Sequence, residues 1–154
     1  MTTTLYNLAA RSLGIREAVG GEHHPLIQFG FSLCSGYGLE TPDEVPWCSA
    51  WLQVWPWLLG LPRSKSAAAR SWLTVGTPID LDDARRGFDV VILSRAGSLT
   101  AGHVGLYVEH DAVTVTLLAG NQGNRVSVAA YPRDRILGVR RLHEELTNDD
   151  AMVD

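Results

Sequence analysis

The feature that most constrains the fold is a change of pattern near Gly76, where apolar residues at helical spacing give way to short runs of β-branched side chains separated by turns. Helices followed by an antiparallel meander predict an α+β fold with N-terminal helices packed on a C-terminal antiparallel sheet. The 154 residues suffice for one domain with a real core. We therefore expect a single domain over residues 1–143 and an acidic, flexible tail over residues 144–154.

Four helices and five strands are expected. The first helix runs over residues 5–13, capped by Thr4 and ended by Gly14, and the others are expected at 24–34, 46–60 and 64–73. Pro56 lies inside the third helix and is expected to kink it or cut it short. The strands are expected at 88–94, 103–110, 112–120, 125–131 and 135–142.

Charge and hydropathy exclude two classes of protein. The net charge is −4, and no basic block is longer than the pairs Arg85-Arg86 and Arg140-Arg141, so we expect no nucleic-acid binding. The longest apolar stretch, residues 50–61, is interrupted by Gln53 and Pro56 and is too short to span a bilayer. The N-terminus lacks the basic and apolar regions of a signal peptide, which predicts synthesis in the cytoplasm.

The segment VPWCSAW, residues 45–51, places Cys48 in the first turn of the third expected helix. Unpaired amides and the helix dipole lower the pKa of a thiol at such a position, and the same amides can hold an oxyanion. Cys48 is therefore a candidate nucleophile, and a small buried hydrophobe is the alternative interpretation. Cys34 lies in an apolar helix and is expected to be a buried thiol. Two cysteines at this spacing fit neither a disulfide framework nor a zinc site.

A cysteine nucleophile needs a base, and His103 is the best candidate because it opens an expected strand directly after Gly102. An antiparallel hairpin brings the start of one strand beside the end of the next, which places Asn121 and Gln122 near His103. Either amide can orient the imidazole. The alternatives are a structural histidine and a simple glycine-rich turn. The other histidines are expected at the surface or in caps: His23, His24, His110 and His143.

Three motifs in this order, DEVPWCSAW, GHVGLYV and GNQGNRV, resemble the NlpC-like and CHAP cell-wall hydrolases, in particular their small phage- or effector-associated branch. The similarity covers about residues 8 to 142. It implies a papain-like α+β fold and hydrolysis of amide bonds in peptidoglycan, by an endopeptidase or an N-acetylmuramoyl-L-alanine amidase. By motif, Cys48 would be the nucleophile, His103 the base and Asn121 the orienting residue, with Gln122 as its competitor. The resemblance implies no cofactor and no metal.

The resemblance also extends to substrate and context. Trp47, Tyr37 and Gln122 are candidate substrate-binding residues, with packing as the alternative for Trp47 and Tyr37, whereas Trp51 and Trp55 are expected in the core. We expect a monomer that reaches the cell wall or periplasm through a holin, a phage tail or a secretion system, with an immunity protein as partner in the last case. The alternative functions are a cysteine protease that acts on proteins and a phage tail or wall-binding component in which catalysis is secondary.

One departure from the family pattern lies in RRGFDVVIL, where Phe88 separates Gly87 from Asp89. Such enzymes usually have Gly-Asp at this point. The insertion predicts a shifted turn that could alter the rim of the site.

Overall fold

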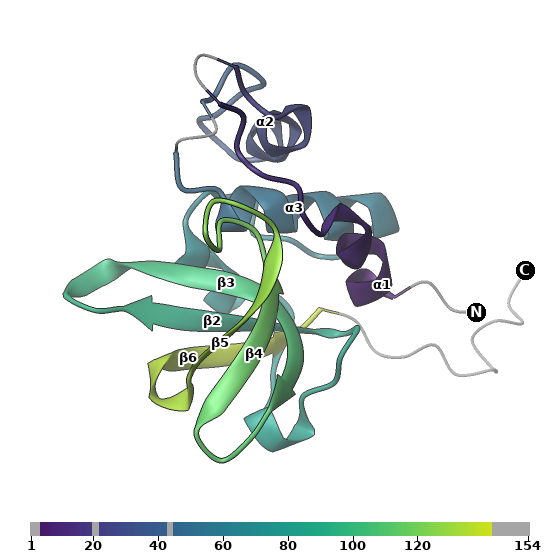
Figure 1. Ribbon diagram of the computed structural model, residues 1–154. Coiled ribbons are helices and arrows are strands. Elements are labelled where there is room, and N and C mark those ends of the chain that lie inside the picture. Colours follow the sequence, from purple (N-terminus) through teal and green to yellow (C-terminus); the bar gives the residue numbers. More distant parts are fainter. Residues whose placement is uncertain (1–3, 20–21, 43–44, 143–154) are drawn as a thin grey trace, which may run out of the picture.

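The computed structural model describes residues 4–19, 22–42 and 45–142. A small helical part lies on one side of a six-stranded antiparallel sheet, and Figure 1 shows α3 lying between α2 and the sheet. The predicted α+β class, with helices first and an antiparallel sheet second, is confirmed. His143 and the expected flexible tail lie outside the described residues.

Three of the four expected helices form where local signals put them. Helix α1, Leu5–Ala9, begins after Thr4, whose Oγ1 accepts a hydrogen bond from the Asn7 amide, and a 3-10 turn, η1 (Ala10–Ser12), follows it. Helix α2, Pro25–Ser32, begins after His24, whose Nδ1 accepts a hydrogen bond from the Leu26 amide. Helix α3, Cys48–Leu59, ends at Gly60 in the left-handed conformation.

Pro56 does not end α3, contrary to expectation. The helix continues past Pro56 to Leu59. Because this proline lies in the last turns of the helix, its missing N–H removes one helical hydrogen bond close to the natural end, and the turns that precede it keep theirs.

The prediction of a fourth helix at residues 64–73 is wrong for the first half of that range. Only η2, Ala69–Thr74, is helical, and it is a 3-10 helix. The segment before it is held instead by the buried Gln53 of α3, whose Oε1 accepts a hydrogen bond from the Lys65 amide and whose Nε2 donates one to the Ser66 carbonyl. These tertiary hydrogen bonds override the helical preference of an alanine-rich stretch.

The sheet has the order β1-β6-β2-β3-β4-β5. Its strands are β1 (Thr77–Pro78), β2 (Asp89–Arg95), β3 (Ser98–His110), β4 (Thr114–Ala119), β5 (Ser127–Pro132) and β6 (Ile136–Arg141). Strands β2 to β5 form the expected meander, but β6 returns to pair with β2, and β1 was not expected. A further 3-10 turn, η3 (Leu81–Asp83), precedes β2, and η4 (Arg133–Arg135) precedes β6.

Both faces of the sheet are covered by apolar side chains. Alternate residues of β2 and β3 pack toward the helices, among them Val90, Ile92 and Val104, and the residues between them join a second cluster on the opposite face. Trp51 and Trp55 are in the core, as predicted. Helix α2 approaches α3 closely at Gly30, where an added Cβ would lie 2.4 Å from the Ala50 carbonyl oxygen. This packing fixes the start of α3 against the sheet.

Phe88 directly precedes β2, and the shifted turn expected there stays a prediction. Asp89 is fully buried at the start of β2, and its carboxylate binds Arg141 through two contacts of 2.9 and 3.0 Å. His103 pairs with Leu93, at the other end of β2. Asp89 therefore anchors β6 at the end of β2 that lies away from His103.

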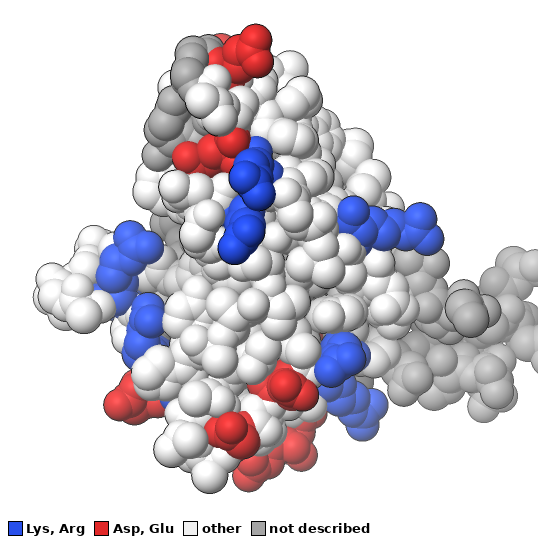
Figure 2. Space-filling model, in the orientation of Figure 1, with Lys and Arg blue, Asp and Glu red and all other residues white. Residues whose placement is uncertain are grey.

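Charged side chains are unevenly placed on the surface. On the face shown in Figure 2, acidic side chains gather mainly at the lower end, basic ones stand apart from each other, and the middle is uncharged. Within the described residues, no helix has the length and apolar character needed to cross a membrane.

Candidate active site

Cys48 is the first residue of α3, and its sulfur lies against the backbone of β3. The backbone of Val104, together with that of Ser49 and of Cys48 itself, favours the thiolate and lowers the pKa of the thiol. Val104 directly follows His103 in the chain. The helix start and the strand that carries the histidine therefore meet at this point, as the sequence predicts.

The pKa of the Cys48 thiol moves in the direction opposite to the one expected. The side chain is only 7% exposed, and burial raises its pKa above the ordinary value by more than the backbone amides and the positive charge of Arg95 lower it. Cys34 is buried as predicted, and burial raises its pKa to about 11. Both cysteines are free thiols.

His103 is buried in β3 and held by Gln122, whose Oε1 lies 3.0 Å from the imidazole Nε2. The amide nitrogen of Gln122 donates to the Ser127 carbonyl at 2.7 Å, which fixes the orientation of the amide. Its Oε1 also accepts a hydrogen bond from the Tyr131 hydroxyl at 2.9 Å. Because Oε1 can only accept, Nε2 of His103 carries the proton, and Nδ1 keeps a free lone pair that can act as a base.

The surroundings of His103 keep it neutral. Burial lowers its pKa, the hydrogen bond with Gln122 raises it, and the positive charges of Arg95 and Arg135 lower it further, so that the net shift is downward. Burial therefore favours the neutral form of both the Cys48 thiol and the His103 imidazole.

The hydrogen bond to His103 comes from Gln122 and not from Asn121, which was expected to orient the ring. Strand β4 ends at Ala119, and Asn121 adopts a left-handed backbone conformation, with φ +59°, in the turn that follows. The side chain that returns to His103 is therefore that of the next residue. The hairpin argument is correct to within one residue. Gln122 is buried and its amide is engaged within the protein, so it does not face a substrate.

His103 also lies differently in its strand than expected. Strand β3 begins at Ser98, so that His103 is inside it and pairs with Leu93 of β2. Its pairing with β4 begins only at Leu106, which faces Leu118. His103 is thus at the point where β3 and β4 part, and the start of α3 packs against β3 there at Val104.

Trp47 does not line a substrate groove, which corrects the prediction made for it. The side chain is fully buried, and its Nε1 donates a hydrogen bond of 2.9 Å to Glu17. An added Cβ at Gly120 would lie 2.6 Å from the Trp47 ring. Trp47 therefore supports, from inside, the turn that carries Gln122.

Tyr37 lines a surface hollow of about 340 Å³ beside the start of α3. The lining is uncharged and consists of Ser35, Tyr37, Val45, Pro46, Ser66, Ala67 and Ala68. The Tyr37 ring lies 5.3 Å from that of Phe31, and the Ser66 carbonyl accepts a hydrogen bond from Ser49 Oγ. The hollow is a candidate site for part of a substrate, and the binding role of Tyr37 stays a prediction.

Two residues of β5 were missed in the sequence. Tyr131 and Ser127 both hold Gln122, and the Tyr131 ring lies 5.4 Å from that of His103. They are four residues apart in one strand and therefore share a face of the sheet. This alternation in SVAAY was the available signal, but only the pairing of β5 with β4 reveals which face meets His103.

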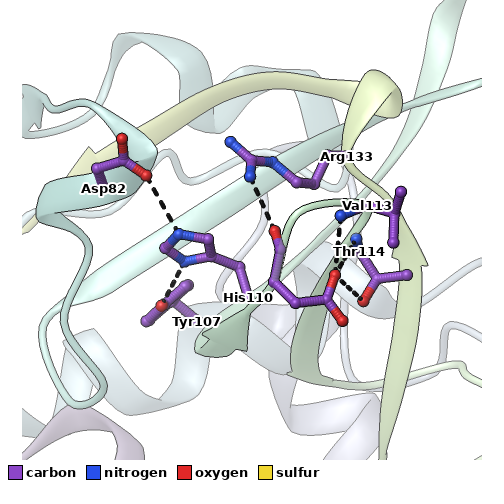
Figure 3. A network of polar contacts seen from close by, with 7 residues as sticks. Asp82, Tyr107, His110, Val113, Thr114 and Arg133 are labelled. Carbon is purple, nitrogen blue, oxygen red and sulfur yellow. Dashed lines mark hydrogen bonds and ion pairs between the residues drawn. The ribbon is translucent and has the colours of Figure 1, made fainter.

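His110 has structural surroundings at the end of β3. Figure 3 shows His110 between Tyr107, whose hydroxyl lies 2.7 Å from Nδ1, and Asp82, 3.3 Å from Nε2. This contact ties η3 to the end of β3, next to a turn in which Asp111 accepts hydrogen bonds from the amides of Val113 and Thr114. Over the described ranges, no group of three or more His, Cys, Asp or Glu side chains is arranged to hold a metal ion.

Comparison with models of known protein families gives no match to this chain, and comparison with curated proteins gives none either.

Proposed function

We propose that this protein is a cysteine hydrolase with a papain-like arrangement that cleaves amide bonds in peptidoglycan. Cys48 is the nucleophile, His103 the general base and Gln122 the residue that orients the imidazole. The observation that carries the proposal is the packing of Cys48, the first residue of α3, in the same buried cluster as Val104 of β3, the residue that follows His103. The anchoring of Nε2 by Gln122, which leaves Nδ1 free, supports it further.

The reaction begins from the neutral thiol and the neutral imidazole. As the Cys48 sulfur attacks the carbonyl carbon, the thiol proton passes to Nδ1 of His103. The negative charge moves onto the carbonyl oxygen, and amides at the start of α3 are the nearest donors to it, each contributing on the order of 3 kcal/mol in related chemistry. The C–N bond then breaks, and His103 protonates the leaving amine. Water, deprotonated by His103, hydrolyses the thioester and frees the sulfur.

Peptidoglycan is proposed as substrate because of the three sequence motifs around Cys48, His103 and Gln122. The uncharged hollow at Tyr37, whose lining includes Val45 and Pro46 shortly before Cys48 in the chain, gives room for a small side chain. The bond cleaved lies either within the stem peptide or between that peptide and the glycan, and the masses of the fragments distinguish the two.

The test is digestion of purified peptidoglycan by the wild-type protein and by two variants, Cys48→Ala and Cys34→Ala, with mass analysis of the released fragments. We expect fragments from the wild type and from Cys34→Ala, and none from Cys48→Ala. Equal fragment release by Cys48→Ala would refute the nucleophile. Cleavage of a protein such as casein, dependent on Cys48 and without any release from peptidoglycan, would favour the protease alternative.

A further inference from the structure

Arg135 is held one aromatic ring away from His103. It belongs to η4, and its Nε and Nη2 donate hydrogen bonds to the Ser94 carbonyl at 3.1 and 2.8 Å. Its guanidinium carbon lies 5.1 Å from the centre of the Tyr131 ring, which is itself 5.4 Å from the centre of the His103 ring. Nη1 takes part in neither of these bonds. The guanidinium of Arg135 is therefore fixed near His103 and has N–H donors available for a ligand.

Arg95 adds a second cation near His103, because it lies in β2 two residues after Leu93, which pairs with His103. It ends β2 at a shift of register between Ser94 and Arg95, and such irregularities turn a side chain out of the regular sheet pattern. Its side chain is exposed, and its charge acts on both Cys48 and His103. Within the described part of the chain, Arg95 has neither a hydrogen-bond acceptor nor an acidic partner for its guanidinium.

These two cations serve no step of the reaction described above. The charges that act on Cys48 and His103 are those of arginines, and a positive charge makes an imidazole a weaker base. The amide bond to be cleaved is neutral and gains nothing from a guanidinium placed beyond the base. The arginines lower the pKa of His103, and a negative charge on the substrate that binds them would explain why they are present.

We propose that Arg95 and Arg135 form a carboxylate-binding site beside the Cys48–His103 pair, so that the substrate carries a free carboxylate close to the bond that is cleaved. This inference rests on the proposed function for its meaning, but the carboxylate site can be tested without turnover. The planar guanidinium fork matches a carboxylate in geometry and charge, whereas a neutral amide lacks the charge.

The test compares two small thiol reagents that differ in this group. Iodoacetate carries a carboxylate and iodoacetamide does not; in both, the sulfur forms a bond to carbon and iodide leaves. Rates of alkylation at Cys48 are measured by mass spectrometry in the wild type, in Arg95→Gln and in Arg11→Gln. Arg11 is an exposed arginine on η1, so the second variant makes the same change of net charge away from β2.

We expect the ratio of the iodoacetate rate to the iodoacetamide rate at Cys48 to fall about 5- to 10-fold in Arg95→Gln and to stay unchanged in Arg11→Gln. High salt should lower the ratio more in the wild type than in Arg95→Gln, which keeps only the Arg135 cation. The same ratio in the wild type and Arg95→Gln would overturn the carboxylate site, even if peptidoglycan is cleaved.

A different result separates the two proposals. If neither reagent modifies Cys48, the nucleophile and the proposed function fail. The carboxylate site is then decided by NMR titration of Cys48→Ala with glutarate and with glutaramide. Shifts of the Arg135 side-chain signals with glutarate alone, weakened in the double variant with Arg95→Gln, support the site, and equal responses to both compounds overturn it.

Discussion

Replacing Gln122 with alanine removes the only side chain that both anchors His103 and links it to β5 among the described residues. The Gln122 amide makes four contacts of 2.7 to 3.2 Å, with His103 Nε2, the Tyr131 hydroxyl, and the carbonyl and hydroxyl of Ser127. At about 1 kcal/mol of net stabilisation each, these contacts bound the loss of stability at about 4 kcal/mol. Water can reach the half-buried Tyr131 and Ser127, so we expect about 2 to 3 kcal/mol. Domains of this size are commonly stable by more than this, so the variant should stay folded.

The effect of Gln122→Ala on catalysis should exceed its effect on folding. General-base catalysis contributes about 10²- to 10⁴-fold to rate, and an imidazole free to rotate loses part of it. We expect kcat on peptidoglycan fragments to fall about 10- to 100-fold, with little change in KM. The hydrogen bond with Gln122 raises the pKa of His103, so its loss should also move the acid limb of the kcat/KM profile to lower pH. A residue with a merely structural role would leave that limb in place.

The matched control is Asn121→Gly. Asn121 has φ +59°, a conformation that glycine adopts without strain, so this substitution removes the neighbouring amide and preserves the turn. We expect activity within about twofold of wild type, because Asn121 makes no side-chain hydrogen bond to His103 in the described structure. A folded Gln122→Ala protein with full kcat and an unmoved acid limb would refute the reasoning, as would an equal loss in Asn121→Gly.

Three further predictions concern the packing and protonation around the site. Gly120→Ala should lower the free energy of unfolding in urea by about 1 to 3 kcal/mol, because the new methyl group overlaps the Trp47 ring; wild-type stability would contradict this close approach. Asp89→Ala should cost about 3 to 5 kcal/mol in the same assay by leaving Arg141 without its buried carboxylate, and a loss below about 1 kcal/mol would show that the pair is solvated. Burial lowers the pKa of folded His103, so the unfolded chain binds the proton first as the pH falls, and stability should decline below about pH 6.5. His103→Gln should lose less stability than wild type between about pH 7.5 and pH 5.5, and equal losses would exclude a buried neutral histidine.

Local signals were sufficient for the parts of the fold that local chemistry decides. Thr4 caps α1 and Gly60 ends α3, because a hydroxyl acceptor and a residue without Cβ satisfy those ends whatever surrounds them. The approach of His103 to the turn at 121–122 was also predictable, since a hairpin permits few registers. These features determine most of the candidate site.

Other features depend on contacts between distant segments and left no trace in the local pattern. The return of β6 to the free edge of β2 follows from long-range pairing, and the loss of helix before Ala69 follows from hydrogen bonds with Gln53. The residue that contacts His103 is Gln122, one position after the predicted Asn121. A shift of one residue reverses the direction in which a side chain points. Trp47 was misjudged because neither its contact with Glu17 nor its approach to Gly120 is a neighbour relation in sequence.

The raised pKa of Cys48 changes what the start of α3 contributes to the proposed chemistry. The sequence argument used the amides of a helix N-terminus to stabilise a resting thiolate, and those amides do reach the sulfur. The packing around the Cys48 sulfur also excludes water. The loss of solvation raises the pKa of the thiol by more than the backbone amides lower it. In the proposed reaction, the sulfur therefore keeps its proton until a carbonyl carbon is within reach. The negative charge that then develops passes to the carbonyl oxygen, where we propose that amides at the start of α3 stabilise it. The thiol proton can leave only if the imidazole of His103 is already aligned to accept it. The proposed rate should therefore be sensitive to Gln122, which holds that imidazole.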